Sequence, residues 1–141
     1  MKLIIKNKTL YFFALIILLL LSCTPAPRYN STNIIYGVAS HYGHNDGFDG
    51  QQTANGEIFD QYAMTGAHKT LPLNTWVKVT NLDRFTKPSV KIKINDRGPY
   101  IDGRDIDCST GVAQKLGFFN KGTANVKIEI IKWGDNKYYK N

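Results

Sequence analysis

Hydrophobic and polar residues alternate strictly in three short segments of the chain, 77–80, 90–94 and 126–130. β-Branched residues at every second position are typical of strands with one face in the core and the other in water. Residues 35–41 are a less regular candidate, and two short segments, 65–67 and 106–108, add two more. The pattern therefore predicts six short strands.

One short helix is predicted directly after segment 106–108. Ser109 is a suitable N-cap and Gly117 a suitable stop, and the residues between them place Val112, Ala113 and Leu116 on one side. Six short strands and one helix in about a hundred residues are typical of a small closed barrel. We therefore expect an all-β, six-stranded barrel with one short helix.

The N-terminus has the pattern of a secretory signal peptide. Lysines occupy positions 2, 6 and 8, and the uncharged apolar run 10–21 follows, which is too short to span a bilayer comfortably. Residues 20–23 (Leu-Leu-Ser-Cys) resemble the lipobox of bacterial lipoproteins, in which a peptidase cuts before a lipidated cysteine. We therefore expect residues 1–22 to be a lipoprotein signal peptide and Cys23 to anchor the protein to a membrane by its acyl chains. A signal anchor with a coincidental cysteine is the alternative.

The rest of the chain is long enough for one domain and too short for two. Residues 24–33 are rich in Pro, Ser and Asn without periodicity, so 23–33 is expected to be a flexible, lipidated tether. The barrel is expected over 34–133. Residues 134–141 are polar and lysine-rich, and we expect them to form a frayed tail. We expect the protein to be a monomer.

Charge and cysteine content narrow the class of protein. The net charge of +7 falls to +4 once the three signal-peptide lysines are removed. A charge of this size suits an anionic wall polymer and is too weak to indicate nucleic-acid binding. Cys108 is the only cysteine besides Cys23, so lipidation of Cys23 leaves no disulfide. We expect Cys108 to be a small buried residue of the core.

Four segments in turns that the predicted strands would hold contain ionisable side chains, namely Glu57, His68, Asp96 and Asp107. Asp96 follows strand 90–94 directly, and the Gly98-Pro99 pair then forces a sharp turn. A carboxylate held in this way is preorganised for general acid or base catalysis. Glu57 and His68 lie in two other loops, and with Asp96 they would suit glycoside cleavage if the fold brings them together.

Each of these residues also has an ordinary structural interpretation. Asp96 would cap its own turn or pair with Arg97, Glu57 would be a loop residue, and His68 would be a hydrogen-bonded histidine at the barrel end. Asp107 precedes the predicted helix, so we expect it to stabilise the helix start or to pair with Arg104.

A metal site is the other chemical hypothesis that the residues raise. His41, His44, Asp46, Asp49 and His68 offer enough ligands for zinc. Their spacing matches no zinc signature, and the loop 43–50 lacks the carboxylate pattern of a calcium loop. We therefore expect neither a metal nor an organic cofactor.

Several motifs together resemble a known family. They are GVASHYG at 37–43, TANGE at 53–57, AHKTLPL at 67–73, VTNL at 79–82, NDRGPY at 95–100 and GTA at 122–124. In this order and spacing they resemble the rare-lipoprotein-A family of endolytic peptidoglycan transglycosylases. The resemblance covers roughly residues 36–131, and it implies a double-psi β-barrel related to expansins.

The resemblance also implies an activity. Family members cleave the β-1,4 bond between N-acetylmuramic acid and N-acetylglucosamine, preferably in glycan strands stripped of stem peptides. The muramyl 6-hydroxyl attacks its own anomeric carbon and leaves a 1,6-anhydro end. The partner would be the glycan strand, and the place of action the bacterial cell envelope, facing the periplasm or the wall.

Site residues carry over by matching motif. Asp96 would be the general acid and then the base, and Glu57 and His68 would be the other catalytic or substrate-orienting groups. The candidates for substrate binding are Tyr42, Asn55, Arg97 and Tyr100. Tyr42 and Tyr100 lie beside the motifs and are candidates to stack on sugar rings, with packing at the barrel rim as the alternative.

Other functions remain open. The first is a wall-binding module that grips glycan without cleaving it, as expansins are thought to do. The second is a hydrolase of the same bond, which requires a second carboxylate to hold a water. The third is a structural partner of other envelope proteins. Many family members carry a C-terminal wall-binding repeat domain, which is not found after the barrel of this chain, and this leaves targeting to the division septum in doubt.

Overall fold

A computed structural model describes residues 33–139 of the chain. The predicted signal peptide and the predicted lipidation site at Cys23 lie outside the described residues. The strands are β1 (Ile34–Tyr42), β2 (Thr65–His68), β3 (Thr75–Asn81), β4 (Ser89–Asp96), β5 (Ile106–Ser109) and β6 (Ala124–Lys132), and the helix is α2 (Thr110–Leu116). All six predicted strands and the predicted helix are therefore confirmed.

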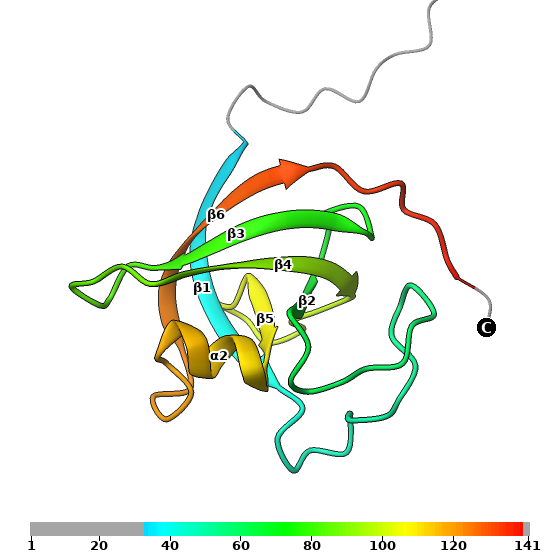
Figure 1. Ribbon diagram of the computed structural model, residues 1–141, viewed down its shortest axis with the longest axis horizontal. Coiled ribbons are helices and arrows are strands. Elements are labelled where there is room, and N and C mark those ends of the chain that lie inside the picture. Colours follow the sequence, from blue (N-terminus) through cyan, green and yellow to red (C-terminus); the bar gives the residue numbers. More distant parts are fainter. Residues whose placement is uncertain (1–32, 140–141) are drawn as a thin grey trace, which may run out of the picture. The chain divides into compact units, whose positions relative to one another are not determined.

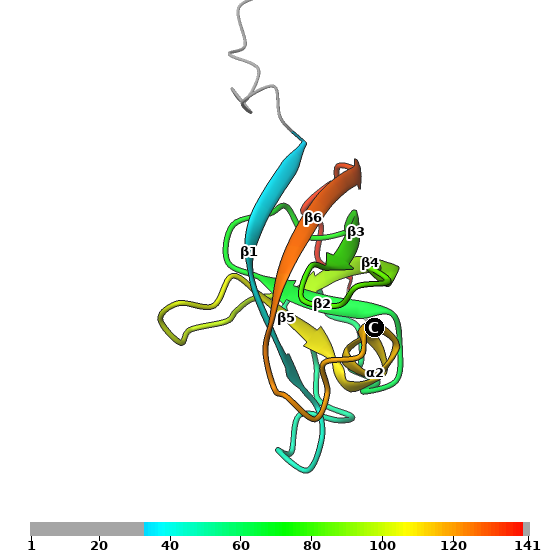
Figure 2. The ribbon, with the colours of Figure 1, turned by 90° about the vertical axis from the view of Figure 1, so that its left-hand side faces the viewer.

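The six strands form a closed barrel in the order β1-β5-β2-β4-β3-β6. Two pairs, β1 with β5 and β2 with β4, are parallel, and the other four are antiparallel. Figures 1 and 2 show β1 and β6, the first and last strands, running side by side. Closure pairs every strand on both sides, so the barrel has no open sheet edge.

The hydrophobic residues of the alternating segments face the inside of the barrel, and the polar residues face its outside. Val77 is paired with Ile92 and Val79 with Ile128, and none of these four side chains is exposed to solvent. The polar positions between them face outward. Cys108 is also fully buried in this core, where burial raises the pKa of its thiol. This confirms its predicted place in the core.

The helix begins and ends where the sequence predicts. The Ser109 hydroxyl accepts a hydrogen bond from the Val112 amide at 3.3 Å, and Gly117 has the left-handed φ of 74° that favours glycine at a helix end. α2 packs against β1, β4 and β5 (Figure 1). Within residues 33–139, no helix is long and apolar enough to cross a membrane.

The segment after β6 does not fray in its described part, residues 134–139. The Asn136 amide donates to the Leu73 carbonyl at 3.1 Å, and the Leu73 amide donates to Asn136 Oδ1 at 3.0 Å. The Tyr139 amide donates to the Asn55 carbonyl at 2.6 Å. In Figure 1 this segment (red) passes the ends of β3 and β4. The prediction of a frayed tail is wrong here because these polar residues bond to loops that are distant in the sequence.

Candidate active site

Asp96 is the last residue of β4, and its carboxylate is held by the backbone. Its Oδ1 accepts hydrogen bonds from the amides of Ala54 and Arg97, both at 2.9 Å. No ion pair joins Asp96 to Arg97 among the described salt bridges. Of the two structural alternatives, the structure shows Asp96 capping its own turn through the Arg97 amide and does not show an ion pair with Arg97. The catalytic role of Asp96 stays a prediction.

Asp96 faces a pocket of about 250 Å³ at the ends of several strands. The lining residues are Tyr42, Phe48, Ala67, Asp96, Arg97, Gly98, Pro99, Tyr100 and Asp107. Four of the predicted site residues therefore meet here: Tyr42, Asp96, Arg97 and Tyr100. We refer to this hollow as the acidic pocket, because two carboxylates line it.

The second carboxylate belongs to Asp107, for which the sequence indicated only a structural role. Its Oδ1 accepts a hydrogen bond from the Ser40 hydroxyl, and its Oδ2 lies 3.6 Å from where a β-carbon on Gly98 would be. Burial raises the pKa of the Asp107 carboxyl, against the hydrogen bond from Ser40, and the negative charge of Asp96 raises it further. A carboxyl of this kind keeps its proton to a higher pH than an ordinary aspartate.

Asp107 is not the residue that caps the helix, because Ser109 does so. The expected role at the helix start is therefore wrong, and the charge of Arg104 acts on Asp107 without an ion pair within the described region. What brings Asp107 to the pocket is strand pairing, with Ser40 on one side and Ala67 on the other. A signal in the sequence was available, since Asp107 is an ionisable residue inside the short strand candidate 106–108.

Tyr42 lines the acidic pocket, and its ring packs against Phe59. The ring is stacked on Phe59, with centroids 4.4 Å apart and planes 16° apart. Burial raises the pKa of the Tyr42 hydroxyl, and the charges of Asp96 and Asp107 raise it further, so the group stays protonated and can donate. Tyr100 is 82% exposed, which leaves its ring open for the predicted contact with sugar.

Arg97 is braced by backbone and side-chain acceptors on the far side of its turn. Its Nη1 donates to the carbonyls of His68 at 3.0 Å and Leu71 at 2.7 Å, and its Nη2 donates to Asn136 Oδ1 at 3.1 Å. The guanidinium therefore ties the turn after Asp96 to the C-terminal segment, while the residue still lines the acidic pocket.

The loop 53–57 supports Asp96 from outside the pocket. Asn55 is fully buried, donates to Asn74 Oδ1 at 2.9 Å, and accepts from Thr53 Oγ1 at 2.7 Å. Its predicted contact with substrate is thus corrected to a role in holding the loop, because a side chain with no exposed surface reaches no ligand.

Glu57 lies in the same loop and does not line the acidic pocket. Its carboxylate pairs with Lys93 and accepts from Asn95 Nδ2 at 3.0 Å. Burial favours a higher pKa for Glu57, but the hydrogen bonds from Lys93 and Asn95 outweigh it and lower the pKa. Glu57 is therefore an anion at neutral pH, which fits an orienting role better than proton donation.

His68 is a hydrogen-bonded turn residue at the end of β2 and does not line the acidic pocket. Its Nδ1 accepts from the amides of Thr70 at 3.2 Å and Leu71 at 3.0 Å. Burial lowers the pKa of His68 to about 4; the charge of Asp105 opposes this, and Arg97 adds to it. The ring is therefore neutral at physiological pH and acts as an acceptor within the turn.

We expect His68 to make the protein less stable as the pH falls from 6.5 to about 4. Its folded-state pKa of about 4 is lower than the ordinary 6.5, so in this window the unfolded chain takes up a proton that the folded one does not. The free energy of unfolding should fall by about 3 kcal/mol across the window. His68→Asn keeps an acceptor for the turn and removes the titration, so urea unfolding at several pH values should show a flatter dependence.

His44→Asn is the matched control, because His44 is exposed and its loss should leave the pH dependence as it is. An equal pH dependence in the parent chain and in His68→Asn would show that His68 is not the titrating group.

Two of the candidate metal ligands, His41 and Asp46, lie within hydrogen-bonding distance of backbone groups. His41 Nε2 lies 3.1 Å from the Phe119 carbonyl, and Asp46 accepts from the Gly43 amide at 2.7 Å. In the described part of the chain, no group of three or more His, Cys, Asp or Glu side chains is arranged to hold a metal ion.

Comparison with solved structures shows the fold. An expansin of Clavibacter michiganensis superposes with a TM-score of 0.55 over 70% of this chain and 50% of its own, at 18% identity. The Streptomyces papain inhibitor superposes with a TM-score of 0.54 over 70% of this chain and 94% of its own, also at 18% identity. The predicted expansin-like double-psi β-barrel is confirmed.

Comparison with curated proteins finds close relatives in sequence. The endolytic peptidoglycan transglycosylase RlpA of Vibrio cholerae is 54% identical over 95 residues, which are 67% of this chain and 35% of the relative. The protein of the same name from Campylobacter jejuni is 47% identical over 100 residues, 71% of this chain and 35% of the relative. The chain thus spans about a third of the length of these relatives. A family model described as lytic transglycolase matches residues 34–128, so the chain belongs to the lytic transglycolase family.

Proposed function

We propose that the chain is an endolytic peptidoglycan lytic transglycosylase, which cleaves the MurNAc–GlcNAc bond of peptide-stripped glycan strands and leaves 1,6-anhydro-MurNAc ends. The observation that carries this proposal is the pair of carboxylates, Asp96 and Asp107, that line one pocket in a member of the lytic transglycolase family. The relatives named as endolytic peptidoglycan transglycosylases support the same reaction.

The two carboxylates divide the proton transfers. The family resemblance implies Asp96 for both; we assign the donor role to Asp107, which lines the same pocket and whose carboxyl has a raised pKa. Asp107 protonates the glycosidic oxygen as its bond to the muramyl C1 breaks, and GlcNAc leaves with a new 4-hydroxyl. The muramyl 6-oxygen bonds to C1, and its proton passes to Asp96. No water is consumed, and solvent returns the two carboxyls to their starting states.

The remaining predicted residues support this pair. The Tyr42 hydroxyl stays protonated and has no hydrogen-bond partner among the described residues, so we assign it to donate to the substrate, and Tyr100 offers an exposed ring to a sugar. Glu57 orients the loop that holds Asp96, and His68 supports the turn that braces Arg97. The proposal requires neither a metal nor a cofactor.

The place of action follows from the N-terminal pattern and from the substrate. We place the protein in the cell envelope of a bacterium, as a monomer facing the periplasm or wall, held by lipid on Cys23. The lipobox-like residues 20–23 and the relatives that act on peptidoglycan support this placement. A wall-binding module is the second candidate, because a variant of the Clavibacter expansin with the same fold was solved in complex with cellohexaose.

Mass spectrometry of peptidoglycan products tests the proposed function. The full chain is incubated with intact and with peptide-stripped glycan, and soluble fragments are weighed. We expect fragments that end in 1,6-anhydro-MurNAc, which are lighter by one water than the products of hydrolysis. Fragments that have gained water would identify a hydrolase. Binding to the glycan without any fragments would identify a wall-binding module.

A further inference from the structure

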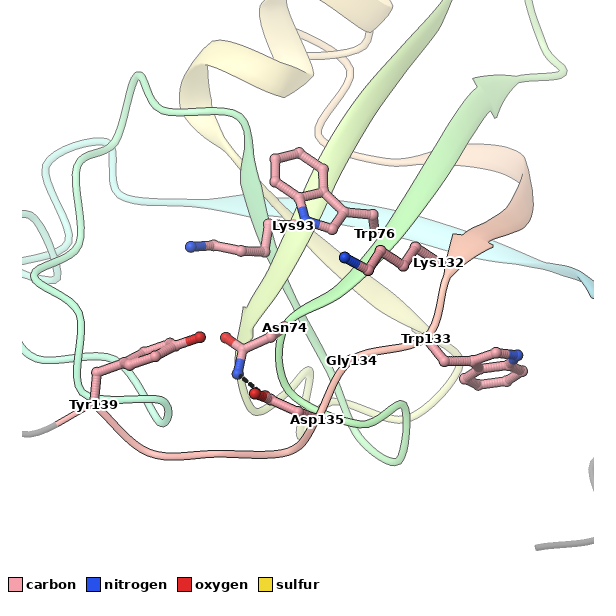
Figure 3. A pocket seen from close by; sticks show the side chains of 8 residues that line it. All are labelled: Asn74, Trp76, Lys93, Lys132, Trp133, Gly134, Asp135 and Tyr139. Atoms are coloured by element: carbon pink, nitrogen blue, oxygen red, sulfur yellow. Dashed lines mark hydrogen bonds between the residues drawn. The ribbon is translucent and has the colours of Figure 1, made fainter. Parts of the chain in front are cut away.

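A second hollow, of about 320 Å³, lies on the outer surface of the barrel beside the C-terminal segment. Figure 3 shows Trp76 and Tyr139 on two sides of it, with Lys93, Lys132, Asn74 and Asp135 between or below them. We call it the tryptophan pocket. The proposed reaction uses none of these side chains directly.

Strand register explains how this pocket is built. Trp76 on β3 is paired with Lys93 on β4 and with Lys132 on β6, so the three side chains form a row across the outer face. Trp76 is 40% exposed although it is a large apolar side chain. The C-terminal segment adds Asp135 and Tyr139 to this row. Pairing of β3 with β4 and β6, together with the C-terminal segment, therefore places the exposed Trp76 indole beside polar groups.

Hydrogen bonds within the pocket hold Asn74 and Asp135, whereas Lys132 is available to a ligand. Asn74 Nδ2 donates to Asp135 Oδ1 at 2.7 Å, and the Lys137 amide donates to the same oxygen at 3.1 Å. Lys132 has no ion-pair partner among the residues that the structure describes. An apolar face edged by an amide, a carboxylate and an ammonium suits a pyranose ring, which has apolar C–H faces and a rim of hydroxyls.

The loop 53–57 lines neither the tryptophan pocket nor the acidic pocket, but it bonds to residues that line each of them. On one side the Ala54 amide donates to Asp96 at 2.9 Å. On the other, Glu57 pairs with Lys93, and the Asn55 carbonyl accepts from the Tyr139 amide at 2.6 Å. Lys93 precedes Asp96 by three residues on β4, which is about 10 Å of strand. A distance of this order is spanned by a few linked sugars.

We propose that the tryptophan pocket is a second glycan subsite, which takes one pyranose ring of the strand against the Trp76 indole. The inference rests on the proposed function and adds to it. An enzyme that cuts inside a strand must hold sugars on both sides of the scissile bond, and the acidic pocket is small. Contacts away from the reacting bond that are equal in the ground state and the transition state hold the strand and lower KM.

Tryptophan fluorescence tests the subsite, because Trp76 and Trp133 are the only two tryptophans of the chain. In an Asp96→Asn chain, in which we expect cleavage to be slow enough for a binding measurement, Trp133→Phe leaves Trp76 as the only indole. A peptide-free glycan oligosaccharide should change its emission saturably. Calorimetry on the same protein measures binding independently. Binding by calorimetry with an unchanged Trp76 emission would overturn the subsite and leave the proposed function standing. Absence of binding in calorimetry would overturn both.

Matched variants measure what the indole contributes to affinity. Trp76→Ala should weaken binding of the oligosaccharide about tenfold, while Trp76→Phe should recover most of the affinity, since it keeps an aromatic face. Phe85→Ala is the control, because Phe85 is fully exposed in the β3–β4 turn. In the active chain Trp76→Ala should raise KM and leave kcat nearly unchanged. The proposal would be contradicted if folded Trp76→Ala bound the oligosaccharide as tightly as Phe85→Ala does.

Discussion

Asp96→Asn is expected to lower the rate of glycan cleavage by a factor of about 10² to 10⁴, which is the usual contribution of one general acid or base. The asparagine keeps the size of the side chain and an oxygen that accepts from Ala54 and Arg97, as Asp96 Oδ1 does. It has lost the ability to take up a proton. The measurement is the initial rate of formation of anhydro-ended fragments by mass spectrometry.

The control for this variant is Asp102→Asn, which removes an exposed carboxylate on the loop that follows the Gly98-Pro99 turn. We expect it to cleave at the parent rate. Thermal unfolding of both variants should show that the barrel is intact, because neither change touches the core. A cleavage rate in Asp96→Asn equal to that of the parent chain would remove Asp96 from the reaction.

Asp107→Asn is expected to produce a loss of similar size, because it removes the group that we assign as the proton donor. The assignment also makes a prediction about pH. A donor must be protonated, so kcat/KM should fall as the pH rises through the pKa of Asp107. Since burial places this pKa above the ordinary value of 3.8, activity should extend to a higher pH than an ordinary aspartic acid allows.

Ser40→Ala separates this role from a purely structural one. The Ser40 hydroxyl donates to Asp107, and this hydrogen bond lowers the pKa of the carboxyl. Its removal should raise that pKa, so the alkaline limb of the kcat/KM profile should move to higher pH while cleavage continues. A limb that stays in place in Ser40→Ala would show that another group donates the proton.

The sequence by itself determined the elements of the barrel and one half of its acidic pocket. Alternation at 77–80, 90–94 and 126–130 predicts strands because a two-residue period is a local property of the chain. Ser109 and Gly117 predict the helix ends for the same reason, since caps act within one turn. Asp96 was found because its strand and its turn are adjacent in the sequence.

Only the tertiary structure decided which other groups lie near Asp96. Asp107 reaches the acidic pocket through its pairing with Ser40, 67 residues away. Asn55 was expected to bind substrate, but its side chain is fully buried. The side chain donates to Asn74, and the Asn55 carbonyl accepts from the Tyr139 amide, and both partners are distant in the sequence. The C-terminal segment was expected to fray because its composition is polar. Strand order sets the contact of Asp107 with Ser40, and bonds between distant loops set those of Asn55 and the C-terminal segment, so neither follows from local pattern.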